Sequence, residues 1–301
     1  MWREIMAVGS LEDASGDVES RSLDYQRSAG YPRARAGHCG FFYYRFMVIF
    51  GGISSKGQLL NDLWLFDTVE MVWFEIDVGG DWPSPRAHLG GTAVTPEGVA
   101  YFVGGKTDTG VSSEVWALNL LGILDQQYLR WEEINVSGAS VERYGHQCFN
   151  VDNDTILLFG GLDGSQGPRN DVWEFNLSSK SWSQVAKESV GPAPRGFYAA
   201  DLIGNVLIVF GGLTASGTLV GDGWFYNVDT QVWYQYYEPE LEIFEDRLLS
   251  RSGAKVVYAD SVQHPVLYGG QTKNGQFPRS MLRLEIQPCS LASHMAKAQC
   301  Y

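Results

Sequence analysis

The sequence has 301 residues, of which 45% are hydrophobic and 19% charged, a composition typical of a globular protein. Its formal net charge of −13 argues against a general nucleic-acid-binding surface, which needs clustered Lys and Arg, so we expect no nucleic acid among its partners. The four Cys form no CxxC pair and the five His form no cluster at metal-ligand spacing, so we expect no metal and no cofactor.

The longest apolar run, 46–50, is too short to cross a membrane, and the first residues lack the apolar core of a secretory signal. We therefore expect a monomeric protein with reduced thiols in the cytoplasm, with the nucleus as the alternative, and no membrane partner.

Five Gly-Gly pairs divide the chain into units of about fifty residues. Each pair follows a short β-rich run bounded by Gly, which is typical of a buried strand. The five pairs are Gly51-Gly52, Gly104-Gly105, Gly160-Gly161, Gly211-Gly212 and Gly269-Gly270.

Other residues recur in phase with the Gly-Gly pairs. An Arg opens each unit: Arg35, Arg86, Arg143, Arg195 and Arg251. After the pair and a small-polar loop, four units carry a first Trp: Trp64, Trp116, Trp173 and Trp224. A second Trp follows in the next strand: Trp73, Trp131, Trp182 and Trp233. Each unit thus predicts four strands, which we name a to d in chain order, and the fifth unit lacks both Trp.

This order of Arg, Gly-Gly and paired Trp resembles the kelch repeat. The resemblance implies an all-β kelch propeller made of four-stranded blades. The repeat count predicts five blades, with six possible, in a single propeller over 1–288. The expected blades are 33–76, 84–136, 141–186, 193–236 and 251–287, and 289–301 is a C-terminal tail.

The fifth unit ends after its third strand, and residues 1–6 resemble a missing fourth strand. Trp2-Arg-Glu-Ile5 is similar to Trp73-Phe-Glu-Ile76. We therefore predict that the N-terminal strand at Trp2 completes the last blade and closes the ring, which would remove exposed strand edges. Residues 7–32 are then an acidic loop.

Most of the recurring residues predict a structural role. The Gly pairs allow positive φ and close backbone approach, and the Trp side chains are expected to pack blade against blade. Asp62, Asp171 and Asp222, two residues before a Trp, are expected to accept backbone N–H bonds in a turn.

The five Arg leave two roles open. They can bond carbonyls or carboxylates inside the propeller, or they can form a cationic mouth that grips acidic groups of a partner. The candidate partner-binding residues are Arg35, Arg86, Arg143, Arg195, Arg251, Lys106, Tyr236, Tyr237 and Phe244. The last three belong to a long acidic and aromatic d–a loop, which favours a partner with basic segments.

We therefore predict a protein-interaction module, a scaffold or adaptor, that binds a protein or peptide on the face formed by the d–a and b–c loops, with no catalytic residue. Two alternatives remain open. One is the substrate-recognition subunit of a ubiquitin ligase, and the other is a small-anion-binding or metal-dependent propeller enzyme.

Overall fold

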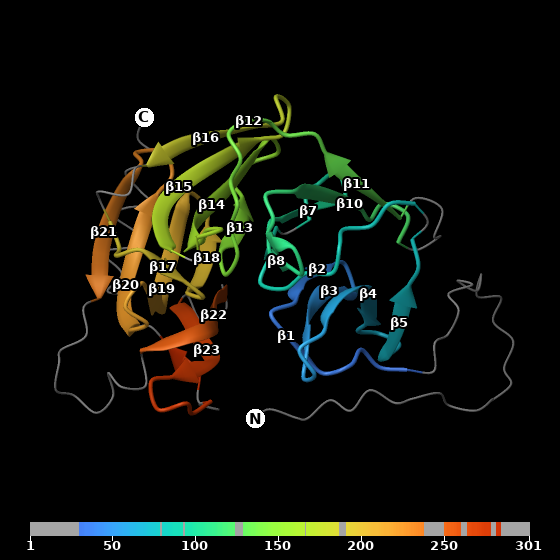
Figure 1. Ribbon diagram of the computed structural model, residues 1–301, viewed down its shortest axis with the longest axis horizontal. Helices are drawn as coiled ribbons and strands as arrows, with labels where there is room; N and C mark the ends of the chain where they lie inside the picture. Colours follow the sequence, from blue (N-terminus) through green and yellow to red (C-terminus); the bar gives the residue numbers. More distant parts are fainter. Residues whose placement is uncertain are drawn as a thin grey trace, which may run out of the picture. The chain divides into compact units, whose positions relative to one another are not determined.

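The computed structural model describes residues 30–78, 80–92, 94–123, 129–165, 167–186, 191–237, 250–259, 264–277 and 281–283. All regular elements in these ranges are β-strands, as Figure 1 shows, and the predicted all-β propeller class is confirmed. The chain divides into two compact units, Met1–Asn135 and Val136–Tyr301. No helix long and apolar enough to span a membrane occurs in the part of the chain that the structure describes.

The first unit contains blades 1 and 2. Blade 1 consists of β1 (Arg35–Ala36), β2 (Cys39–Tyr43), β3 (Phe46–Ser54), β4 (Leu59–Asp67) and β5 (Val72–Ile76). Blade 2 consists of β6 (Gly90–Gly91), β7 (Val99–Val103), β10 (Val115–Asn119) and β11 (Arg130–Ile134). A small hairpin of β8 (Lys106–Thr107) and β9 (Gly110–Val111) connects strands b and c of blade 2.

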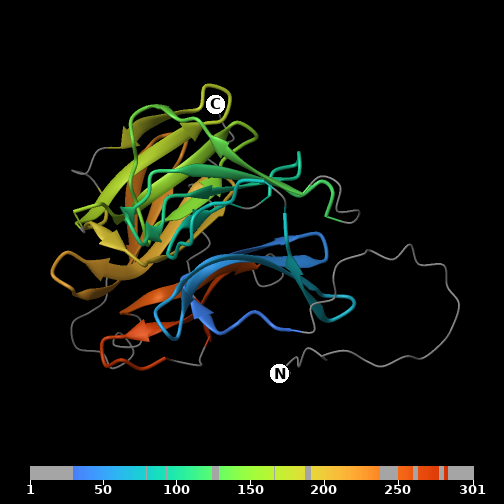
Figure 2. The same ribbon diagram turned by 45° about the vertical axis from the view of Figure 1, so that its right-hand side comes forward.

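The second unit contains blades 3, 4 and 5, and the twist of the individual sheets can be followed in Figure 2. Blade 3 consists of β12 (Ser137–Gly138), β13 (Gln147–Asn150), β14 (Thr155–Leu162), β15 (Pro168–Asn176) and β16 (Ser181–Ala186). Blade 4 consists of β17 (Arg195–Gly196), β18 (Ala199–Ile203), β19 (Val206–Thr214), β20 (Leu219–Asn227) and β21 (Val232–Tyr237). Blade 5 consists of β22 (Arg251–Ala259), β23 (His264–Thr272) and β24 (Met281–Arg283).

Blades 1 to 4 are antiparallel sheets in the order a-b-c-d that the repeat predicts. Strand a of blades 1 and 4 is broken into two short strands, and both parts pair with strand b. The repeat did not predict strand β12, which lies in the segment after blade 2. It pairs in parallel with the outer strand β16 of blade 3. The predicted closing strand at Trp2 lies outside the described residues.

The Gly-Gly pairs mark β-bulges at which neighbouring blades approach closely. All ten glycines have positive φ, as predicted, and the b–c register shifts at the pair in blades 1, 3 and 4. A Cβ on Gly51 would lie 2.7 Å from the Arg86 carbonyl oxygen of blade 2, and one on Gly211 would lie 2.8 Å from the Arg251 carbonyl oxygen of blade 5. Side chains at these positions would therefore separate adjacent blades.

The second Trp of a blade packs on strand b of the blade before it. The Trp131 ring of blade 2 lies 4.8 Å from the Phe50 ring of blade 1, and the Trp233 ring of blade 4 lies 4.8 Å from the Phe159 ring of blade 3. Both Trp residues are buried. The predicted blade-on-blade packing of the Trp side chains is confirmed at these two junctions.

The second glycine of a pair should not tolerate a side chain. In Gly212→Ala, the new Cβ would lie 2.9 Å from the Gly196 carbonyl oxygen at a φ of 106°, so we expect a loss of about 2 kcal/mol or more in the free energy of unfolding. Gly217→Ala is the matched control, because Gly217 also has positive φ but has no atom within 4 Å of its Cβ position. Urea unfolding measures both, and equal losses would contradict the close-approach role.

Candidate binding face: arginine clamps beneath the b–c hairpins

Four blades contain a hydrogen-bonded group of an Arg, an acid and a Trp, which we call the clamp. The Arg comes from the start of the blade, and the acid lies two residues before the first Trp. The four clamps are Arg35–Asp62–Trp64, Arg86–Glu114–Trp116, Arg143–Asp171–Trp173 and Arg195–Asp222–Trp224.

The clamp of blade 4 shows the geometry. Arg195 forms a two-pronged ion pair with Asp222, with Nη1 to Oδ1 at 2.6 Å and Nη2 to Oδ2 at 2.9 Å. Nη1 also donates to the Gly211 carbonyl oxygen at 3.0 Å, and Nε donates to the Ala193 carbonyl oxygen at 2.9 Å. The Trp224 indole N–H donates to Asp222 Oδ2 at 2.7 Å. One guanidinium thus connects strands a, b and c of the blade.

The clamp holds its acid in the charged form. Burial alone would raise the pKa of Asp222, but the hydrogen bonds and charge of Arg195 and the indole N–H of Trp224 outweigh it and lower that pKa. The Asp residues therefore serve chiefly as partners of Arg and Trp, whereas we expected them to accept backbone N–H bonds. In blade 2, Glu114 takes the same place.

Blade 3 has an incomplete clamp. Arg143 contacts Asp171 through one oxygen only, at 2.6 Å, and its Nη1 donates to the Glu142 carbonyl oxygen. The Nε of Arg143 and the Oδ1 of Asp171 are buried without a hydrogen-bond partner, as are both ring nitrogens of His146. Burial and, to a lesser extent, the charge of Arg143 lower the pKa of His146 to about 3, so this imidazole is neutral.

In blade 5, the described part of the clamp is the bond between Arg251 and strand b. Arg251 Nη1 donates to the Gly269 carbonyl oxygen at 2.8 Å, and burial lowers the pKa of the Arg251 guanidinium. The sequence has Ser280 where the other blades have their acid. Across the described residues, no group of three or more His, Cys, Asp or Glu is placed to hold a metal ion.

The guanidiniums thus bond carbonyls and carboxylates inside the propeller, which is the first of the two roles that the sequence left open. The Arg195 residue is 0% exposed, and Arg86, Arg143 and Arg251 are also buried. A cationic mouth of available arginines is therefore not formed in the described residues. The physical reason is that these guanidiniums already have acceptors in their own blades. Exposing one would break its hydrogen bonds and, in blades 1 to 4, its ion pair.

Short, internally bonded hairpins connect strands b and c directly above the clamps. In blade 1, the Ser54 N–H donates to the Gln58 carbonyl oxygen and the Gly57 N–H donates to the Ser54 carbonyl oxygen, both at 2.9 Å. The hairpins Thr214 to Thr218 in blade 4 and Thr272 to Gln276 in blade 5 repeat both bonds.

The remaining two b–c connections are also fixed. In blade 3, the Asp163 carboxylate accepts bonds from Ser165, Gly167 and Arg169. In blade 2, β8 and β9 form the connection. These loops are therefore preformed rather than adaptable.

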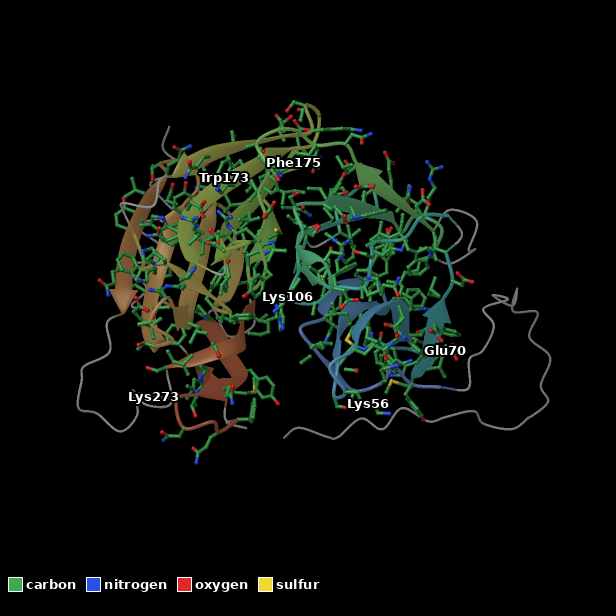
Figure 3. All side chains as sticks on the ribbon, in the orientation of Figure 1. Lys56, Glu70, Lys106, Trp173, Phe175 and Lys273 are labelled. Carbon is green, nitrogen blue, oxygen red and sulfur yellow. The ribbon has the colours of Figure 1, made fainter. Side chains whose placement is uncertain are left out.

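Lysines stand on three of the five hairpins. Lys56, Lys106 and Lys273 are exposed on blades 1, 2 and 5 (Figure 3), with Asp108 as an exposed acid on the blade 2 hairpin. Of the predicted partner-binding residues, Lys106 is the one whose described side chain is exposed at this face.

Tyr236 differs from the exposed anchor that we predicted. Its ring stacks on Phe225 at 4.1 Å and fills the space above Gly223, where a Cβ would lie 2.3 Å from the Tyr236 Cζ atom. Tyr236, on β21 of blade 4, is therefore partly buried and packs against the core. Only the backbone of Tyr237 is described, pairing with Gly223, and Phe244 lies outside the described residues.

The pairing of each Arg with the acid of its clamp was not predicted, although the spacing of these residues in the sequence indicates it. The Arg and the acid are separated by 27 residues in blades 1 and 4 and by 28 in blades 2 and 3. A nearly constant offset between opposite charges in a repeat indicates a contact that recurs from unit to unit.

Comparison with known proteins adds relatives that share this repeat. Residues 17–139 and 119–240 match the family model described as the KLHDC2/KLHL20/DRC7 Kelch-repeats domain. Kelch domain-containing protein 3 of Homo sapiens is 27% identical over 209 residues, which are 66% of this chain and 53% of that protein. Acyl-CoA-binding domain-containing protein 4 of Arabidopsis thaliana is 31% identical over 188 residues, 60% of this chain and 27% of that protein.

A third relative is much longer than this chain. The dynein alpha chain of the flagellar outer arm of Chlamydomonas reinhardtii is 30% identical over 156 residues, 52% of this chain but 3% of that protein. The matches thus span about half of the length of the Kelch domain-containing protein and far less of the other two.

Breaking one clamp should destabilise the protein strongly. Arg195→Met leaves the Asp222 carboxylate without its ion-pair partner, so we expect a loss of about 3–5 kcal/mol in the free energy of unfolding. Arg33→Met is the control, because Arg33 is exposed and donates one 3.3 Å bond to Gln58, and it should cost less than about 0.5 kcal/mol. Chemical denaturation compares them, and a mild Arg195 variant would contradict the structural role.

The clamp also predicts how stability depends on pH. Because the folded pKa of Asp222 is lowered, its stabilising effect is present above the unfolded Asp pKa of about 3.9 and is lost as the pH falls through the folded pKa. The difference in unfolding free energy between wild type and Asp222→Asn should therefore be largest near neutral pH and shrink below about pH 4. Denaturation at several pH values measures this difference, and a constant difference would exclude the mechanism.

Proposed function

Because the chain belongs to the kelch-repeat family, whose propellers are protein-interaction domains, we propose that it binds a partner protein or peptide on the face formed by its b–c hairpins and the adjoining d–a segments. The observation that carries the proposal is the clamp, which in blades 1, 2 and 4 ties the start of strand a to strands b and c immediately below the hairpin.

A preformed surface supports this function. Hairpins that are already hydrogen-bonded lose little conformational entropy when a partner binds, so more of the contact energy appears as affinity. The b–c hairpins of blades 1, 4 and 5 have the same two backbone bonds but different tips, with Lys56, Ser216 and Asn274 at corresponding positions. A constant scaffold with variable tips is typical of a recognition surface on a repeat protein.

The charges of this face refine the expected partner. On the first unit, Lys56 and Lys106 favour acidic groups on the partner, and on the second unit Lys273 does so, even though the whole chain carries a net charge of −13. The acidic composition of the chain and of its long d–a loop predicted basic segments on the partner, but the b–c hairpins themselves carry exposed lysines. We therefore assign acidic contacts to this face.

The cytoplasm or the nucleus is the proposed location. The four Cys of the chain are few and widely spaced, unlike the dense disulfide frameworks of small secreted domains.

Charge reversal at two hairpins tests the proposed face. Lys56→Glu/Lys106→Glu should lose interacting proteins in affinity capture followed by quantitative mass spectrometry, because it places like charges opposite an acidic partner surface. The control is Lys180→Glu/Lys255→Glu, which makes the same charge change at two exposed lysines away from the b–c hairpins. Substituting clamp arginines would be less informative, because it would disrupt the blade itself.

The two double variants should unfold at similar denaturant concentrations. If both retain the same interacting proteins as wild type, the b–c hairpins are not the binding face.

A further inference from the structure

A second exposed surface lies at the opposite strand ends from the b–c hairpins. It consists of Tyr43 and Tyr44, at the turn between β2 and β3, and Leu121, which follows β10; we call these three residues the aromatic patch. Tyr44 is 82% exposed and Leu121 is 61% exposed. Phe42, on the same hairpin as the two tyrosines, is 64% exposed.

The residues of the aromatic patch are contiguous. The Tyr43 and Tyr44 rings are 4.5 Å apart. Gly98 in blade 2 brings Tyr43 and Leu121 together, because a Cβ on Gly98 would lie 3.0 Å from Tyr43 Oη and 2.8 Å from Leu121 Cδ2. The patch therefore spans two neighbouring blades of the first unit.

A tyrosine at position 44 is unfavourable for the stability of the fold. It has a φ of 51°, in the left-handed region that non-glycine residues enter at a cost of roughly 1 kcal/mol. The corresponding turn of blade 4, between Ile203 and Val206, has Gly204 at this position with a φ of 58°. An aromatic residue that is both strained and exposed contributes little to folding, which points to a role in binding.

Acidic residues flank the aromatic patch. Glu97 is exposed next to Gly98, and Glu70 is exposed on the neighbouring c–d turn of blade 1 (Figure 3). Arg45, the basic residue that directly follows Tyr44 in the sequence, forms an ion pair with Asp67, with Nη2 3.0 Å from Oδ2. Arg130, at the start of β11, is an exposed cation on this side of blade 2. Glu70 and Glu97 thus give the surroundings of the two tyrosines a negative charge.

We propose that the aromatic patch is a docking site for a basic segment of a partner protein that carries an aromatic or aliphatic anchor. The anchor would pack on Tyr44 and Leu121, and flanking Lys or Arg side chains would pair with Glu70 and Glu97 or lie over a tyrosine ring. This site is separate from the proposed b–c face, and it matches the partner with basic segments that the net charge favours.

Tyr44→Gly is a decisive variant, because it removes the ring and also relieves the backbone. The probe is a short fluorescent peptide with a Trp between Lys pairs, and the comparison peptides carry Glu in place of Lys or Ser in place of Trp. We expect wild type to prefer the Lys and Trp peptide over both others, and Tyr44→Gly to weaken its binding roughly tenfold or more. Unfolding of Tyr44→Gly should show unchanged or higher stability.

Further variants separate the contributions. Glu70→Gln/Glu97→Gln should weaken binding of the same peptide and reduce its dependence on salt concentration. Tyr268→Ser, at an exposed tyrosine of the second unit, should bind the peptide like wild type. Lys56→Glu/Lys106→Glu should also bind it like wild type, so failure of the b–c proposal and failure of this one are distinguishable.

Three results would overturn the proposal. The first is that wild type does not bind the Lys and Trp peptide or binds the Glu peptide equally well. The second is that Tyr44→Gly binds as tightly as wild type. The third is that wild type self-associates in sedimentation whereas Tyr44→Gly does not, because the aromatic patch would then bind a second copy of this chain.

Discussion

The buried guanidinium of the clamp is the interaction on which the blade structure depends. A charged group that is removed from water is costly unless its hydrogen bonds and its charge are both satisfied. Arg195 meets this requirement with a carboxylate and two backbone carbonyls. Because these acceptors belong to different strands, satisfying one side chain fixes the relative positions of strands a, b and c.

The clamp also explains why glycine stands at this point of strand b. In blades 1 and 4, the first glycine of the pair accepts a hydrogen bond from the Arg of its own blade at its carbonyl oxygen, and its Cα faces the Arg carbonyl of the next blade. Gly211, for example, accepts from Arg195 and lies against Arg251. The Arg and Gly positions of the repeat are therefore two sides of one contact, which explains why they recur in phase.

Charge is distributed unevenly around this framework. The chain has a net charge of −13, but its exposed basic and acidic residues are not mixed evenly. Lysines stand on three b–c hairpins, whereas Glu70 and Glu97 flank the aromatic patch at the other strand ends. Two surfaces of different chemistry can thus serve two partners, or two segments of one partner.

The repeat made the fold predictable, because the Gly-Gly pairs indicate positive φ and the Trp residues indicate packing between blades. The partner of each Arg was not predictable to the same degree, since a guanidinium can bond acceptors inside or outside the blade and only the packed blade decides. Tyr236 shows the same limit: its aromatic, acidic sequence surroundings suggested exposure, but the missing side chain of Gly223 lets its ring pack inward. The closing role of Trp2 falls outside the described residues and stays a prediction.

The most direct test of the account is amide hydrogen exchange at the b–c hairpin of blade 4. If the clamp fixes this hairpin, Arg195→Met should speed exchange of the Gly217 amide and of the Thr214 amide more than it speeds exchange at the centre of β19, and Arg33→Met should do neither. Unchanged relative protection of the hairpin in Arg195→Met would show that the hairpins are ordered independently of the clamps and would contradict the account.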